Sequence, residues 1–120
     1  MFRFEKLAVW QKSVAFADLV YAASRKFPSE ERFGLTNQIR RAVISIPSNI
    51  AEGAARSDPD FCKFLSYATG SLYEVVTQLH IARRQAMLDE STSARLYMDA
   101  EEISRMLSGL RDSIGGNSPS

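Results

Sequence analysis

Residues 33–53, FGLTNQIRRAVISIPSNIAEG, decide how this chain folds. Apolar side chains recur in this segment at steps of three and four residues, which is the spacing of one face of an α-helix. Pro47 lies within the same helix, where it removes one backbone donor and crowds the carbonyl group of Val43. The segment therefore predicts one long helix whose apolar face consists of Ile39, Val43, Ile46, Ile50 and the following Ala54.

A second face of this helix is polar along most of its length: Gln38, Arg41, Ser45, Ser48 and Glu52. A solvated helix face usually mixes Lys and Glu, whereas this one carries small hydroxyls, an amide and one charge of each sign. That composition favours contact with another protein surface or a ligand. One hypothesis is that Arg41, Asn49 and Glu52 line a groove or pore.

The alternative interpretation of this face is structural. Ser45 and Ser48 would satisfy the backbone carbonyls that Pro47 leaves without a donor. Asn49 and Glu52 would hydrogen-bond to Tyr73, Thr77 or Gln78 of the third helix, in a buried network that fixes the register of the two helices. We define the polar stripe as Gln38, Ser45, Pro47, Ser48, Asn49 and Glu52.

Three further helices are expected around this one. Apolar spacing predicts helices at about 5–26 and 59–87, and a last helix with a heptad stripe at Leu96, Ala100, Ile103, Leu107, Leu110 and Ile114. The expected N-caps are Thr36 or Asn37, Asp58 before Pro59, and Ser91 or Thr92. Short turns make this an all-α, antiparallel up-down four-helix bundle. Residues 1–114 would form a single domain, and 115–120 a flexible C-terminal tail.

Composition narrows the classes of function. The chain of 120 residues has a net charge of +1, so no overall charge draws it to nucleic acid or membrane. Its 12 basic and 8 acidic side chains in residues 1–87 contrast with 3 basic and 6 acidic ones in residues 88–120. A single cysteine, Cys62, fits a reducing cytoplasm, and no apolar run is long enough to span a bilayer. We therefore expect a cytoplasmic protein without a membrane partner.

Enzyme motifs are mostly absent from the sequence. A di-iron bundle needs Glu-x-x-His pairs on two helices, whereas Thr77 precedes the single histidine, His80, by three residues. A zinc site needs three or four Cys or His ligands. A hydrolase using His80 with a nearby serine or Glu74 has no supporting motif. We expect no catalytic residues, no metal and no cofactor, with His80 a partly buried or interface residue.

Basic residues are the better candidates for a binding site. Arg40 and Arg41 near the start of the second helix are expected to approach Arg83 and Arg84 near the end of the third, with Arg56 and Lys63 at the opposite end of that hairpin. Arginine binds phosphate through two hydrogen bonds and stacks on bases. The predicted nucleic-acid contacts are these six residues. The alternative is that they are ordinary solvated or salt-bridged side chains, with Arg41 paired to Glu52 or Glu74.

The aromatic residues near the N-terminus suggest self-association. The first helix is apolar on more than one side, which one small bundle cannot easily hide. Phe2, Phe4, Trp10 and Phe16 would then form an exposed patch of the kind that marks an interface. Simple packing in the core is the alternative for these four residues.

Seven segments of the chain resemble a known bacterial family: FEKLAVWQK (4–12), FP (27–28), FGL (33–35), QIRRA (38–42), SIPSNIAEG (45–53), GSLYE (70–74) and TQL (77–79). The family is that of the 23S rRNA intervening-sequence proteins, and the accessory variability proteins of diversity-generating retroelements are similar. The resemblance implies a four-helix bundle assembled into a ring, usually a homopentamer. It implies no known active site.

The leading hypothesis is a non-enzymatic, homo-oligomeric bundle that binds nucleic acid or acts as a scaffold, with RNA favoured over DNA. The rival is a protein-interaction subunit without nucleic-acid binding of its own, such as an accessory to a reverse transcriptase. The near-zero net charge and the acidic last quarter of the chain favour that rival.

Overall fold

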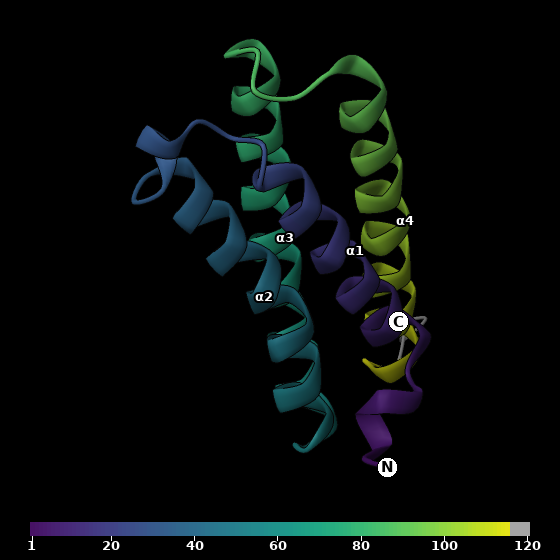
Figure 1. The fold of residues 1–120 in the computed structure, drawn as a ribbon. Coiled ribbons are helices and arrows are strands. Elements are labelled where there is room, and N and C mark those ends of the chain that lie inside the picture. The colour runs from purple at the N-terminus through teal and green to yellow at the C-terminus, as the bar shows by residue number, and fades with distance from the viewer. Residues whose placement is uncertain (116–120) are drawn as a thin grey trace.

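The computed structural model describes residues 1–115, and its regular elements in that range are all helical. In chain order they are the 3₁₀ helix η1 (Arg3–Lys6), α1 (Ala8–Ser24), the 3₁₀ helix η2 (Ser29–Glu31), α2 (Leu35–Ala54), α3 (Asp58–Arg84) and α4 (Glu90–Ile114). The four long helices run up and down in a bundle (Figure 1). The prediction of a four-helix bundle is confirmed. The predicted tail lies outside the described residues except for Gly115.

Each long helix packs against two others. α1 contacts α2 and α4, and α3 contacts α2 and α4, whereas the diagonal pairs stay apart throughout the described chain. The bundle is elongated, about 48 Å by 29 Å by 21 Å. Figure 1 shows the N-terminus and the end of α4 at the same end of the bundle, opposite the α3–α4 turn. The side formed by α1 and α2 is therefore opposite the side formed by α3 and α4.

The apolar face of α2 forms the centre of the core. Ile39, Val43, Ile46 and Ile50 are each 0% exposed, as their spacing predicts. The other helices contribute Val9, Phe16, Val20, Leu65, Leu72, Val75, Leu79, Leu96, Ile103 and Leu107. Phe16 is only 1% exposed, so assigning it to an exposed interface patch was wrong. It faces inward because it shares one helical face with Val9, Val20 and Ala23.

α2 and α3 approach each other closely near the end of α2. A methyl group placed on Gly53 would lie 2.6 Å from Cβ of Phe64 and 3.0 Å from Cδ1 of Phe61. Glycine is therefore the residue that fits this crossing. Figure 1 also shows α2 changing direction about halfway along. Pro47 lies within α2, and an internal proline is a common cause of such a bend.

The helix caps differ from the prediction by one or two residues. α2 begins at Leu35, directly after Gly34, without a side-chain cap from Thr36 or Asn37. Ser57 holds the N-cap position of α3, and Asp58 is already its first helical residue. The cap of α4 is Asp89, whose carboxylate accepts a hydrogen bond of 2.7 Å from the backbone N–H of Thr92.

The third helix ends at Arg84, three residues earlier than the sequence suggested. Ala86 takes a left-handed backbone conformation, with φ of 61°. The N–H of Met87 then donates to the carbonyl of Ala82 at 2.8 Å, and that of Ala86 donates to Arg83 at 3.1 Å. These two bonds form a Schellman motif, which usually has glycine where this chain has Ala86.

Candidate functional site

Two of the six predicted nucleic-acid contacts are engaged within the bundle. The Nε of Arg40 donates to the hydroxyl of Ser24 at 2.8 Å, and its guanidinium lies 4.6 Å from the ring centre of Tyr21. Arg40 thus ties α2 to α1 instead of reaching Arg83 and Arg84. Arg56 forms an ion pair of 3.4 Å with Glu52. Its guanidinium also lies 4.8 Å from the ring centre of Phe64.

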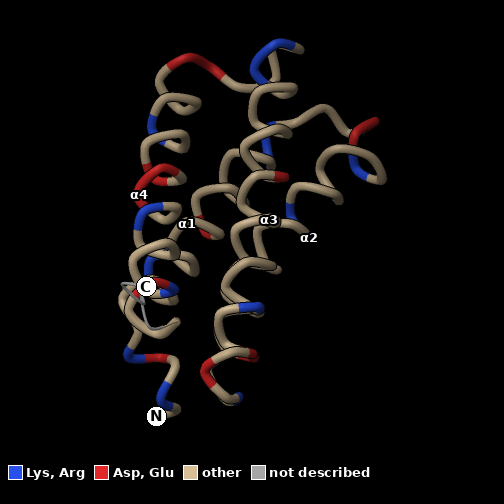
Figure 2. The backbone as a smooth tube through the Cα atoms, turned by 180° about the vertical axis from the view of Figure 1, so that it is seen from behind, with Lys and Arg blue, Asp and Glu red and all other residues tan. Residues whose placement is uncertain are grey.

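The other four predicted contacts are exposed: Arg41, Lys63, Arg83 and Arg84. Within residues 1–115, none of the four forms an ion pair. Lys63 and Arg84 lie near opposite ends of α3 and are about 30 Å apart along the axis, at 1.5 Å per residue. Figure 2 shows Lys and Arg at the end of α3 farthest from the N-terminus of the chain. Arg83 and Arg84 therefore lie at that end, whereas Lys63 lies near the start of α3, at the opposite end of the helix.

A groove between the end of α3 and the start of α4 adjoins this basic end. We call it the α3–α4 groove and define it by His80, Arg83, Glu90, Ser93 and Tyr97. Its volume is about 350 Å³, and Leu79 and Ala94 also line it. The rings of His80 and Tyr97 lie 5.9 Å apart at an angle of 76°. His80 is exposed, so the partly buried alternative was wrong, and its place in an interface stays a prediction.

Tyr97 also borders a second, smaller hollow along the same pair of helices. This hollow, of about 150 Å³, is lined by Tyr73, Val76 and Glu101 among others. Sequence reasoning missed Tyr73, Glu90 and Tyr97 as site residues. A signal was available for Tyr97, because it is an aromatic residue outside the heptad stripe of its helix.

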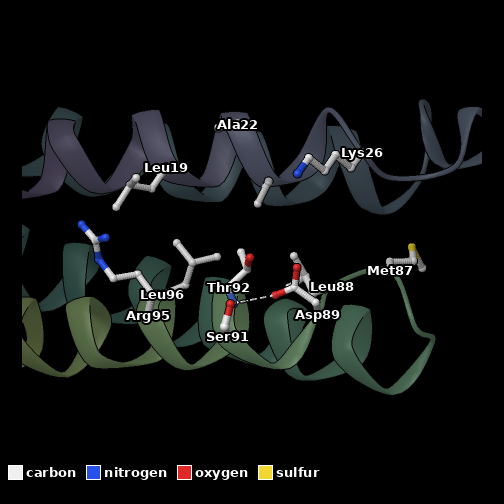
Figure 3. A pocket seen from close by; sticks show the side chains of 11 residues that line it. Leu19, Ala22, Lys26, Met87, Leu88, Asp89, Ser91, Thr92, Arg95 and Leu96 are labelled. Carbon is white, nitrogen blue, oxygen red and sulfur yellow. Dashed lines mark hydrogen bonds between the residues drawn. The ribbon is translucent and has the colours of Figure 1, made fainter.

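A third hollow lies between the end of α1 and the start of α4 (Figure 3). Lys26 and Arg95 border its apolar floor, and its volume is about 390 Å³. The hydrogen bond from the Thr92 N–H lowers the pKa of Asp89 below its ordinary value of 3.8, with smaller help from Ser91 and Lys26. Asp89 is therefore an ionised helix cap here, and its charge disfavours an anion beside Lys26.

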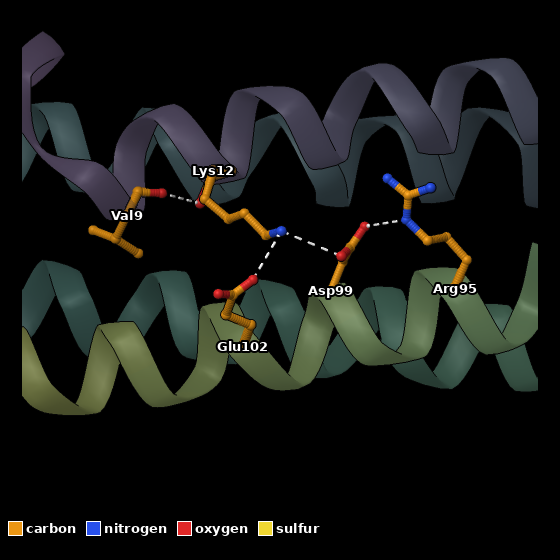
Figure 4. A network of polar contacts seen from close by, with 6 residues as sticks. Val9, Lys12, Arg95, Asp99 and Glu102 are labelled. Carbon is orange, nitrogen blue, oxygen red and sulfur yellow. Dashed lines mark hydrogen bonds and ion pairs between the residues drawn. The ribbon is translucent and has the colours of Figure 1, made fainter.

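Arg95 takes part in a polar network that joins α1 to α4 (Figure 4). Lys12 pairs with Asp99 at 3.2 Å and with Glu102 at 2.8 Å, and Arg95 pairs with Asp99 at 3.3 Å. Hydrogen bonds to Glu102 and then Asp99 raise the pKa of Lys12 above 10.5. Two of the five carboxylates of α4, those of Asp99 and Glu102, are thus paired with cations.

A fourth hollow, larger than the three above, lies between α1 and α2, and we call it the α1–α2 groove. Its volume is about 500 Å³, and Phe4, Trp10, Tyr21, Ile44 and Pro47 line it. The rings of Phe4 and Trp10 pack edge to face at 5.2 Å. Phe2 stacks on Phe4 at 5.8 Å while remaining 72% exposed. Three of the four aromatic residues predicted for an interface thus lie in or beside one apolar groove.

Residues of the polar stripe lie on different sides of α2: some face α3 and others line the α1–α2 groove. Ser45 shares a hydrogen bond of 2.8 Å with Ser71 of α3, and the amide nitrogen of Asn49 donates to the carbonyl and hydroxyl of Ser45 at 2.8 and 2.9 Å. Ser48 and Pro47 line the α1–α2 groove, and Gln38 is exposed.

The predicted cross-helix bonds from the polar stripe to Tyr73, Thr77 and Gln78 were wrong. Glu52 forms an ion pair with Arg56, which lies just after the end of α2, and the side chain of Asn49 donates a hydrogen bond to Ser45 of the same helix. The amide nitrogen of Gln78 donates to Glu74 at 3.3 Å, and its buried Oε1 has no partner among the described residues. The polar stripe instead contacts α3 through the hydrogen bond between Ser45 and Ser71.

Catalytic or metal-binding arrangements are not evident in the described residues. No three His, Cys, Asp or Glu side chains of residues 1–115 are grouped as they would be around a metal ion. His80 contacts the ring of Tyr97 and has no hydrogen-bonded serine or carboxylate in the same range. None of the helices in that range combines the length and the apolar character that crossing a membrane requires.

These features define an all-helical bundle with one basic end and two grooves on opposite sides. The family model of the 23S rRNA-intervening sequence protein matches residues 5–109, so the chain belongs to that family. A crystal structure of a protein of unknown function, from the S23 ribosomal protein family of Bacteroides thetaiotaomicron, has the same fold. It is 25% identical, with a TM-score of 0.80, over 87% of this chain and 95% of that one. No curated protein matches the chain.

Proposed function

We propose that this protein is a cytoplasmic, non-enzymatic RNA-binding scaffold that assembles into a homo-oligomer. The observation that carries the proposal is the set of four exposed cations, Arg41, Lys63, Arg83 and Arg84, without ion-pair partners among the described residues. The name of the family, taken from an intervening sequence of 23S rRNA, supports RNA as the ligand.

Exposed arginines without ion-pair partners are suited to binding phosphate. Arginine offers a planar fork of donors that matches a phosphate oxygen pair. Each phosphate that a cation neutralises releases counterions, so the affinity falls steeply as salt concentration rises. At the end of α3, Arg84 supplies such a contact, and the charge of the adjacent Arg83 adds to the local attraction.

Assembly compensates for the small charge of one chain. A net charge of +1 gives a single subunit little attraction for RNA, whereas symmetric copies repeat the basic end around an axis. The α1–α2 groove is the proposed contact between copies, because its apolar lining continues to the exposed ring of Phe2. Five subunits is the copy number that the family resemblance implies.

Charge reversal at the basic end tests the proposal. In the double variant Arg83→Glu with Arg84→Glu, we expect RNA affinity at 0.1 M salt to fall by at least about tenfold, with a shallower dependence on salt. The measurement is fluorescence anisotropy with labelled RNA at several salt concentrations. The control is Lys6→Glu with Arg105→Glu, which makes the same change in net charge at exposed residues elsewhere. Equal affinities of the two double variants would contradict the proposal.

A second candidate function is supported by the α1–α2 groove. An apolar groove of about 500 Å³ bordered by exposed Ile44 and Phe2 also suits a different protein, such as the enzyme that an accessory subunit would serve. In that case the purified protein binds no RNA even at low salt, and a defined protein occupies the groove.

A further inference from the structure

We propose that the α3–α4 groove binds an unpaired base of RNA and prefers guanine. This inference rests on the proposed function, since it assigns a base-reading site to an RNA-binding protein. The groove is next to the basic end, because Arg83 lines it and Arg84 follows on the same helix. RNA held by these arginines would bring its bases past His80 and Tyr97.

Two aromatic rings form the walls of the groove. Tyr97 is 44% exposed, and the ring of His80 meets it at 76°, so the rings make two sides of a corner. A flat base can stack on one ring while its edge meets the other. Proteins recognise unpaired RNA bases by stacking them on Tyr and His rings.

The polar groups of the groove match the edge of guanine. A carboxylate of Glu90 can accept hydrogen bonds from N1–H and from the N2 amino group, and the guanidinium of Arg83 can donate to O6 or N7. In the described chain, neither side chain is engaged in an ion pair or a side-chain hydrogen bond. Ser93 adds a hydroxyl that either donates or accepts.

The negative charges of this surface favour a base over a phosphate as the occupant. Glu90 lies in the groove and Glu101 borders the adjoining hollow, and both repel a phosphate group. Apart from Glu90, the lining of the α3–α4 groove contains no acidic residue beside Arg83. We therefore assign phosphate contacts to Arg84 and the reading of the base to Glu90, Arg83 and the two rings.

The size of the groove favours single-stranded RNA. A volume of about 350 Å³ accommodates one base and its sugar, and it lies between two packed helices, which a base held inside a duplex cannot enter. The adjoining hollow at Tyr73 shares Tyr97 and offers a position for a neighbouring base. The site thus requires at least one nucleotide that is free of pairing.

Binding of short labelled RNAs tests the assignment. The probes are a ten-nucleotide oligouridine, the same strand with one central guanine or adenine, and the guanine strand annealed to its complement. We expect the wild-type protein to prefer the guanine strand to oligouridine by about tenfold, and to bind the duplex no better than oligouridine. Fluorescence anisotropy at 0.1 M salt supplies the affinities.

Two variants separate the roles of the groove residues. Glu90→Gln keeps the shape but removes the charge and replaces one of the two acceptor oxygens with an NH2 donor, so it should remove the guanine preference without weakening oligouridine binding. Tyr97→Leu should weaken guanine-strand binding by about tenfold, the effect of losing a stacked base. The matched controls are Glu30→Gln and Tyr67→Leu, exposed residues outside the groove, and circular dichroism checks that each variant is folded.

Three outcomes are distinguishable. A guanine preference that Glu90→Gln and Tyr97→Leu remove, while the controls retain it, supports the inference. Wild-type protein that binds all strands equally, with affinities unchanged in both variants, overturns the inference but leaves the RNA-binding function standing. Wild-type protein that binds none of the RNAs overturns both.

Discussion

Ala86 occupies a backbone conformation that glycine adopts more easily. Its φ of 61° brings Cβ close to the following carbonyl group, which costs about 1–2 kcal/mol for a residue with a side chain. We expect Ala86→Gly to raise the free energy of unfolding by about 0.5–1 kcal/mol, because glycine relieves this strain but loses more entropy on folding.

Urea denaturation followed by circular dichroism measures this change. The control is Ala15→Gly, at an exposed position within α1, where the same substitution should destabilise the protein by about 0.5–1 kcal/mol. Destabilisation by Ala86→Gly as large as that of the control would show that the turn carries no strain.

Individual caps were predicted less well than buried residues. Asp89 caps α4 although Ser91 and Thr92 stand close by and have suitable side chains. All three residue types can accept the bond from a backbone N–H, so sequence alone does not select among neighbours. The choice depends on where the preceding turn leaves the backbone, and that turn is set by the conformation of Ala86.

At the level of the helices, the close approach of α2 and α3 at Gly53 predicts the effect of a substitution there. Gly53→Ala would force a methyl group into the 2.6 Å gap to Phe64, so we expect a loss of about 1–3 kcal/mol in the free energy of unfolding. Gly70→Ala is the matched control, because nothing lies within 4 Å of its added methyl group. The control should gain about 0.5–1 kcal/mol. Thermal or urea unfolding of both variants gives the comparison, and equal gains would contradict the close approach.

Helices and core were predictable because one periodicity determines both. Ile39, Val43, Ile46 and Ile50 had to share a face, and burying that face requires other helices. The grooves were not predictable in the same way. Tyr97 and His80 lie on different helices, and only the order in which helices pack brings their rings together. The predicted approach of Arg40 to Arg83 was wrong because it also depended on helix packing. Arg40 instead donates a hydrogen bond to Ser24 of α1.

The apolar α1–α2 groove predicts the behaviour of the whole molecule in solution. Ile44 is 45% exposed at its border and contributes nothing to the buried core. We expect Ile44→Glu to shift the assembled protein toward the monomer without lowering its helix content, because a carboxylate cannot be buried in an apolar contact without a large desolvation cost.

Light scattering after size exclusion measures the mass of the wild type and the variant. The control is Ile81→Glu, at an isoleucine of similar exposure on α3, outside that groove. A monomeric wild-type protein would contradict assembly altogether, and an assembly that Ile44→Glu leaves intact would place the contact on another surface.

The position of the two grooves on opposite sides of the bundle would affect how tightly the proposed assembly holds an RNA. An assembly whose contacts spare the α3–α4 side of every subunit would offer as many of the proposed base sites as it has subunits. Once one guanine of a strand is bound, the next guanine meets a neighbouring subunit at an effective concentration that reaches the millimolar range for short spacers. Avidity would then make the spacing between guanines, and not only their number, a determinant of which RNAs the protein retains.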